Sequence, residues 1–173
     1  MRATALVFSI FLGFFATEAA KADCPAENLV MGAGRAFTSA SKSGSAAAFL
    51  SAASRYTDTR GIALSALGPH RKKLSKAQEG EYLRLAQSFM GKFMSQYSSK
   101  FNTSGMKITT CSGNTVTATV NGGRKVIFRV SGGRVQDVNV SSVWLAGQMR
   151  STFVGVLNKN NGDISALLDY LRG

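Results

Sequence analysis

The chain has 173 residues, with 21 Lys and Arg against 9 Asp and Glu, and 45% of its residues are hydrophobic. Apolar residues are too many and prolines too few, at two, for a disordered chain. No uninterrupted apolar stretch of about 20 residues is present, so the sequence also excludes a polytopic membrane protein.

The first 22 residues have the pattern of an export signal. Arg2 gives a positive start, a mostly apolar run covers 3–16, and Ala20-Lys21-Ala22 has the small-x-small pattern of a cleavage site. An N-terminal anchor that stays attached is the alternative. A signal peptide over 1–22 predicts export of one α+β domain over 23–173, with 19 basic and 8 acidic side chains and a net charge of +11.

The first part of the mature chain, 23–101, is predicted to be helical. We expect helices from Asp23 to about Ala40, from Ala46 to Tyr56 and from Thr59 to Leu67. The longest helix is expected to begin at Ser75, in a capping box with Gln78, and to continue to about Phe101.

An apolar stripe runs along this long helix and includes Tyr82, Phe89 and Phe93. Such a stripe usually packs into a core. The alternative is that part of it lines a cavity, because Met and aromatic side chains adapt well to apolar ligands of variable shape.

From residue 105 the apolar residues alternate with polar ones, which predicts strands over 105–111, 114–120, 124–130 and 134–141. Gly-Gly pairs at 122–123 and 132–133 are typical of tight hairpins. Because the strands are consecutive and amphipathic, helices must cover one face of the sheet. The fold class is therefore α+β, with a curved four-stranded antiparallel sheet wrapped by about five to six helices.

The chain is predicted to end in helices, over 143–171. Ser141 or Ser142 is expected to cap a helix from about Val143 to Asn158, and Asp163 is expected to cap a last helix through Leu171.

The chain has two cysteines, Cys24 and Cys111, and both remain after signal cleavage. Thiols tend to pair outside the cytosol, so we predict one disulfide between them. The alternative is two free thiols.

The residues of the mature chain do not indicate an enzyme. His70 is the one histidine, and its sequence neighbours are cations rather than an orienting acid. One histidine and two paired cysteines predict no metal site, and no nucleic-acid-binding motif is present. The positive charge can attract anionic lipid headgroups or acidic partner surfaces, and the alternative is a solvated basic face with no specific ligand.

Several segments together form a recognisable pattern. Near the C-terminus these are 133–146, 148–153 and 161–168; upstream, Ala66-Leu67-Gly68 is followed by Arg71-Lys72-Lys73 and the long helix. The pattern resembles the MlaC family of periplasmic phospholipid-binding proteins.

The resemblance implies a soluble, monomeric carrier of diacyl phospholipid between inner and outer membranes that maintains outer-membrane lipid asymmetry. The implied partners are an inner-membrane ABC transporter complex with an MCE-domain protein and an outer-membrane lipoprotein complex. Phospholipid is the cargo and no cofactor is implied, and another lipid, such as a hopanoid, is an alternative cargo. A function from a different class is an exported basic interaction module that binds acidic protein or polysaccharide surfaces without a lipid cavity.

A carrier must enclose the lipid tails. Two chains of about 16 carbons would expose roughly 25 kcal/mol of apolar transfer cost, at about 0.8 kcal/mol per methylene. We therefore expect an apolar cavity between sheet and helices. Its expected wall consists of Leu67, Tyr82, Phe89, Phe93, Phe128, Val138, Val140, Trp144, Leu145, Met149 and Phe153.

Overall fold

The computed structural model of the chain describes residues 24–173. The expected signal peptide, 1–22, and the expected helix cap Asp23 lie outside the described residues. Within them no helix is both long and apolar enough to cross a membrane.

The helical part of the fold is close to the one predicted from the sequence. It consists of α1 (Glu27–Ser43), α2 (Ala46–Tyr56), α3 (Thr59–Ala66), the 3-10 helix η1 (Gly68–Lys73), α4 (Lys76–Gln96) and the 3-10 helix η2 (Ser98–Phe101).

Local capping explains several of the helix boundaries. The predicted capping box is present, because the Ser75 hydroxyl accepts from the Gln78 N–H and the Gln78 side chain accepts from the Ser75 N–H. The Asp58 carboxylate accepts from the Gly61 N–H at the start of α3. Gly44, with φ of 63°, ends α1 and bonds back to the Ala40 carbonyl.

The long helix ends at Gln96, earlier than the predicted Phe101. The carbonyls that follow it are taken by side chains distant in sequence: the Ser41 hydroxyl donates to the Ser98 carbonyl at 2.8 Å. The Arg124 guanidinium donates to the Asn102 carbonyl at 2.6 Å. These tertiary bonds favour the separate turn η2 over another turn of α4.

The sheet contains the four predicted strands and one more. The strands are β1 (Lys107–Ser112), β2 (Thr115–Thr119), β3 (Lys125–Ser131), β4 (Arg134–Val140) and β5 (Val143–Trp144). They are all antiparallel and lie in sequence order. Both Gly-Gly pairs adopt positive φ in the predicted hairpins.

The fifth strand corrects the predicted start of the helix that follows. Ser141 and Ser142 do not cap it; they have φ of 52° and 66° and form a tight turn, after which Val143 pairs with Val140. Such turns need positive φ at both central residues and are usually marked by Asn-Gly, so Ser-Ser gave no signal. The chain then forms α5 (Leu145–Lys159) and α6 (Ile164–Arg172), the latter capped by Asp163 as predicted.

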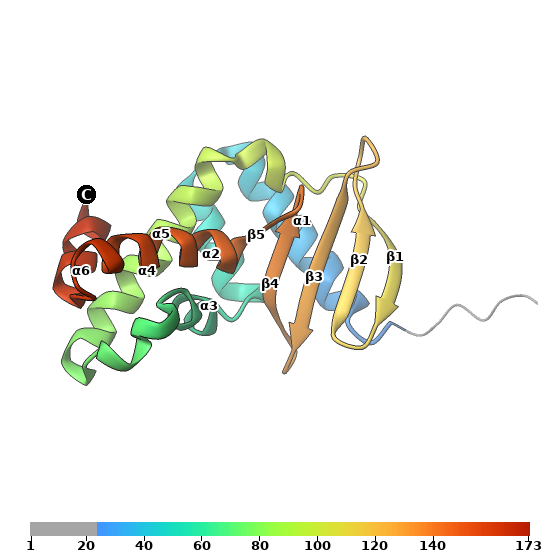
Figure 1. The fold of residues 1–173 in the computed structure, drawn as a ribbon. Coiled ribbons are helices and arrows are strands. Elements are labelled where there is room, and N and C mark those ends of the chain that lie inside the picture. Colours follow the sequence, from blue (N-terminus) through green and yellow to red (C-terminus); the bar gives the residue numbers. More distant parts are fainter. Residues whose placement is uncertain (1–23) are drawn as a thin grey trace, which may run out of the picture.

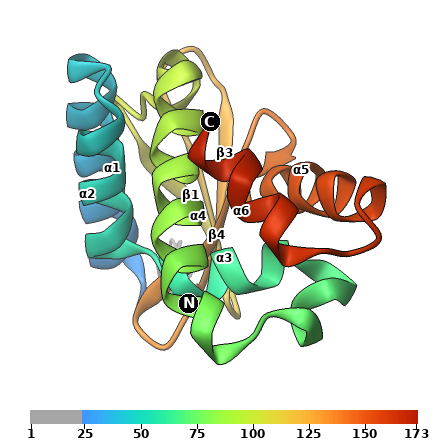
Figure 2. The ribbon, with the colours of Figure 1, turned by 90° about the vertical axis from the view of Figure 1, so that its left-hand side faces the viewer.

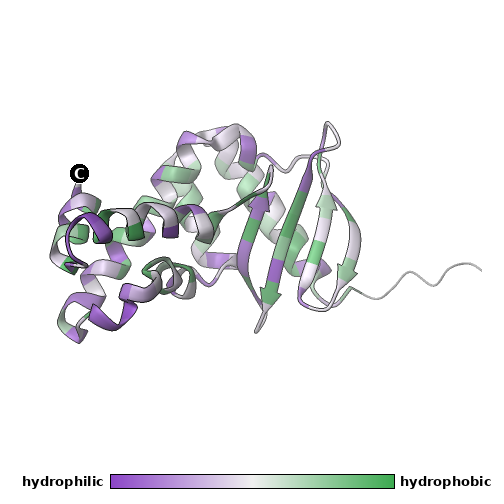
Figure 3. Ribbon diagram, in the orientation of Figure 1, coloured by the Kyte–Doolittle hydropathy of each residue, from purple (hydrophilic) through white to green (hydrophobic). Residues whose placement is uncertain are grey.

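One face of the sheet packs on α1, which lies behind the strands in Figure 1. Val116, Phe128 and Val138 are neighbours across three strands on this face and are at most 3% exposed. Along the strands apolar and polar residues alternate (Figure 3), as a half-buried sheet requires. In the side view, α1 and α2 lie on one side of α4, and α5 and α6 lie on the other (Figure 2).

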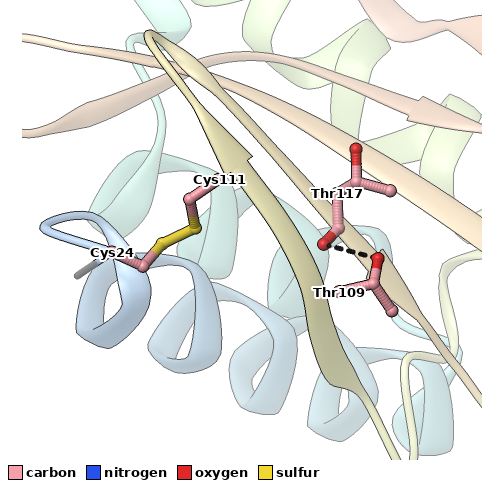
Figure 4. Close-up of a disulfide and its surroundings, with 4 residues drawn as sticks. All are labelled: Cys24, Thr109, Cys111 and Thr117. Atoms are coloured by element: carbon pink, nitrogen blue, oxygen red, sulfur yellow. Dashed lines mark hydrogen bonds between the residues drawn. A yellow bond between two sulfur atoms is a disulfide. The ribbon is translucent and has the colours of Figure 1, made fainter. Parts of the chain in front are cut away.

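The predicted disulfide is present. Cys24, just before α1, is bonded to Cys111 in the edge strand β1, with their Cα atoms 5.7 Å apart (Figure 4). On the same strand the Thr109 hydroxyl donates to the Thr117 carbonyl at 3.2 Å. The disulfide therefore ties the start of the first helix to the outer strand of the sheet.

Candidate functional site

A groove of about 200 Å³ opens where the end of α4 and η2 meet the β4–β5 hairpin and the start of α5. Its lining residues come from α4 and the residue that ends it, from η2, from β4 and β5, and from α5. They are Phe93, Tyr97, Lys100, Phe101, Val140, Val143, Leu145 and Gln148.

The groove is apolar inside and amphipathic at its mouth. Phe101, Val140 and Leu145 form its buried floor, with exposed fractions of 7%, 6% and 3%. Tyr97 and Val143 are 44% and 46% exposed, which is unusual for large apolar side chains in the described part of this chain. Two of the three exposed large hydrophobic residues in 24–173 therefore lie at this one opening.

The secondary structure places these side chains with little freedom. Phe93 and Tyr97 are one helical turn apart, and their ring centroids lie 4.9 Å from each other. Val140 and Val143 face each other across the tight β4–β5 turn. The groove is thus built from the end of α4 with η2 on one side and from the β4–β5 hairpin with the start of α5 on the other.

Asp137 in β4 positions the first turn of α5, and with it Leu145. Its Oδ1 atom accepts from the backbone N–H groups of Ala146 at 3.0 Å and Val138 at 2.9 Å. Burial raises the pKa of the Asp137 carboxyl above its ordinary value, and the two backbone N–H groups and the nearby Arg129 offset part of that rise.

The core next to the groove is rich in aromatic rings and methionines. The Phe153 ring lies 5.2 Å from that of Phe89 and 6.3 Å from that of Tyr82, in edge-to-face arrangements. The Tyr82 hydroxyl donates to the Ala63 carbonyl at 2.5 Å, and burial raises the pKa of that hydroxyl. Met90, Met94 and Met149 are fully buried in the same core.

The eleven residues predicted to line the cavity separate into three groups. Phe93, Val140 and Leu145 line the groove. Seven others belong to the core or pack against it: Leu67, Tyr82, Phe89, Phe128, Val138, Met149 and Phe153.

Trp144 forms the third group by itself. It pairs with Asn139, next to Val138 and Val140, and successive residues of a strand point to opposite faces. The guanidinium of Arg129 lies 4.0 Å from the centre of its ring. Trp144 therefore lies on the face of the sheet turned away from α1, beyond the groove lining.

Five lining residues were not among those predicted: Tyr97, Lys100, Phe101, Val143 and Gln148. Tyr97 and Phe101 belong to the apolar stripe of the long helix, so the sequence did carry a signal for them. Lys100 and Val143 reach the groove only through η2 and the β4–β5 turn, neither of which the sequence indicated.

The described residues contain no group of three His, Cys, Asp or Glu side chains that could hold a metal ion. His70 lies in η1, where its Nε2 atom is 2.8 Å from Asn158 Oδ1. The groove lining itself offers rings, aliphatic side chains, one amide and one ammonium group. Such a set suits an apolar chain with a polar end at the mouth.

Comparison with known proteins gives a consistent picture. The MlaC protein family matches residues 30–173. A similar solved structure is that of the phospholipid-binding protein from Ralstonia solanacearum in complex with a phospholipid. The two align with a TM-score of 0.64 and 16% sequence identity, over 84% of this chain and 91% of the other, which establishes a shared fold. No curated protein sequence matches the chain significantly.

Proposed function

This chain belongs to the MlaC family, and from that premise we propose that it is an exported carrier that binds the acyl chains of phospholipid in its groove. The observation that carries the proposal is the opening at Tyr97 and Val143, where exposed apolar side chains lead to a buried apolar floor. The phospholipid in the similar Ralstonia solanacearum structure supports the same ligand class.

Lipid binding requires the groove to widen. Its volume of about 200 Å³ is below the roughly 300–1,000 Å³ of pockets for drug-sized ligands, and a diacyl lipid is larger than most of those ligands. Met90, Met94 and Met149 are fully buried in the hydrophobic core to which the groove floor residues Phe101, Val140 and Leu145 also belong. Methionine side chains change shape easily, so they suit a core that repacks around acyl chains.

The remainder of the proposal concerns transport. Residues 1–22 direct export to the periplasm, and 23–173 act there as one monomeric lipid-binding domain. The carrier exchanges phospholipid with an inner-membrane ABC transporter complex containing an MCE-domain protein and with an outer-membrane lipoprotein complex, and so maintains lipid asymmetry. Carrying lipid in this way needs no cofactor, nucleic acid or catalytic step from this protein. Enclosing the acyl chains is sufficient, because it removes the free-energy cost of exposing them to water.

Mass spectrometry of organic extracts from the purified protein tests this function. We expect about one phospholipid per chain, and we expect delipidated protein to regain phospholipid from vesicles. Extracts without lipid, together with no uptake from vesicles, would contradict the carrier function. Binding to an acidic polysaccharide under those conditions would instead support the interaction module.

A further inference from the structure

One cation lies at the mouth of the groove. Lys100 is the only charged residue among the lining residues, and its side chain is exposed. The ion pairs formed within 24–173 join Arg60 to Glu79 and Arg172 to Glu81 and Asp169. Among the described residues the Lys100 ammonium therefore has no carboxylate partner, and its charge is available to an anion in solution.

Two contacts join Lys100 to Tyr97, and two further hydrogen bonds hold the segment around it. Its N–H donates to the Tyr97 carbonyl at 2.9 Å, and its ammonium lies 5.6 Å from the centre of the Tyr97 ring. Ser41 and Arg124 fasten the rest of η2 through the carbonyls of Ser98 and Asn102. The ammonium is thus kept beside the ring that marks the opening.

The chemistry of a bound lipid places an anion at this point. When the tails occupy the apolar floor, the headgroup stays in water at the mouth. The phosphate diester, common to all glycerophospholipids, then lies next to the lining lysine. An ammonium group offers three donors to phosphate oxygens and binds them as a point charge.

We infer that Lys100 binds the phosphate of the lipid headgroup and makes the groove selective for phosphate-bearing lipids over uncharged diacylglycerols. This inference rests on the proposed lipid-carrier function. The Lys100 contact is exposed, so its contribution is modest and weakens as salt screens it.

The test measures uptake of phosphatidylglycerol and of tail-matched diacylglycerol from neutral vesicles by four proteins. These are the wild type, Lys100→Gln, Lys100→Arg and a control, Lys92→Gln. Lys92 is also exposed and lies on α4, outside the groove lining. Unchanged thermal unfolding verifies the fold of each variant.

We expect Lys100→Gln to bind phosphatidylglycerol about threefold to tenfold more weakly and diacylglycerol unchanged, with a smaller dependence on salt. Lys100→Arg should restore binding, and Lys92→Gln should match the wild type. Inorganic phosphate should compete better than chloride at equal ionic strength if the site recognises phosphate itself.

Two results would overturn the inference while leaving the carrier function intact. In one, Lys100→Gln binds phosphatidylglycerol as the wild type does; in the other, it loses both lipids equally. A wild-type protein that takes up neither lipid would refute the carrier function and, with it, this role of Lys100.

Discussion

Asp137 and Ala146 lie nine residues apart and are joined by a hydrogen bond of 3.0 Å, from the Ala146 N–H to the Asp137 carboxylate. The strand β4 thereby supplies the cap that α5 lacks locally, since its N-cap residue Trp144 makes no side-chain cap bond. This bond fixes how the helix leaves the sheet beside the groove.

Removing this cap should destabilise the protein. Asp137→Ala leaves the part-buried Ala146 N–H and the buried Val138 N–H without an acceptor, and we expect a loss of about 1–3 kcal/mol in urea unfolding. Asp137→Asn keeps an acceptor oxygen and should retain most of the stability at pH 7. Equal losses in both variants would contradict a capping role.

The same carboxyl should make stability depend on pH. Its pKa is raised in the folded state, so the folded protein binds the proton more tightly than the unfolded chain does. Between the ordinary Asp pKa of about 3.9 and the raised folded pKa, this group therefore lowers stability as pH rises. As pH rises through this window, the free energy of unfolding of the wild type should therefore fall relative to that of Asp137→Asn. A constant difference across the window would show that the folded pKa is not raised.

Glycine in the β4–β5 turn should make the protein more stable. Ser142 has φ of 66°, which costs most L residues roughly 1–2 kcal/mol, whereas glycine adopts it freely. Ser142→Gly should raise the free energy of unfolding by about 1 kcal/mol. The control Ser112→Gly, at the end of β1 where φ is not positive, should be neutral or destabilising. No gain in Ser142→Gly would argue against this turn.

The disulfide should contribute substantially to stability. It joins residues 87 positions apart, and closing a loop of that length gives about 4–5 kcal/mol in the entropy model, with about 2–4 realised. A Cys24→Ser, Cys111→Ser double variant should unfold at correspondingly lower denaturant concentration. Two alkylatable thiols in protein isolated from the periplasm under non-reducing conditions would refute the bond.

A charge at the groove mouth should block lipid binding without unfolding the protein. Tyr97 and Tyr170 have similar exposed fractions, 44% and 48%, but only Tyr97 lines the groove. Tyr97→Glu should lower phospholipid uptake from vesicles about tenfold, because the carboxylate replaces apolar surface at the opening and repels the lipid phosphate there. Tyr170→Glu on α6 serves as the matched control and should bind normally. Equal uptake by both variants would place the lipid elsewhere.

Local sequence signals sufficed for most of the fold. The Ser75 capping box and the Gly-Gly hairpins follow from neighbouring residues alone, and both are present. The Ser141-Ser142 turn was missed because Ser-Ser is not a usual signal for positive φ at both central residues. The early end of α4 was missed because tertiary hydrogen bonds to the carbonyls after it select η2 over what local propensity favours.

The candidate site was only partly predictable for a related reason. Apolar periodicity identifies residues that are buried, such as Phe153 and Met149, but it does not separate a packed core from a cavity wall. The groove forms where segments distant in sequence meet. Lys100 and Val143 join it through short elements that carry no periodic signal.

Photo-crosslinking tests the location of the lipid most directly. Phosphatidylglycerol with a photoreactive group in one acyl chain would be loaded into the protein, irradiated, and mapped by peptide mass spectrometry. We predict that the label falls on peptides from the end of α4 and η2, 89–101, and from the hairpin and α5, 140–153. Label confined to α6 or to the sheet face that carries Trp144, in protein that holds the lipid stoichiometrically, would contradict the assignment of this groove.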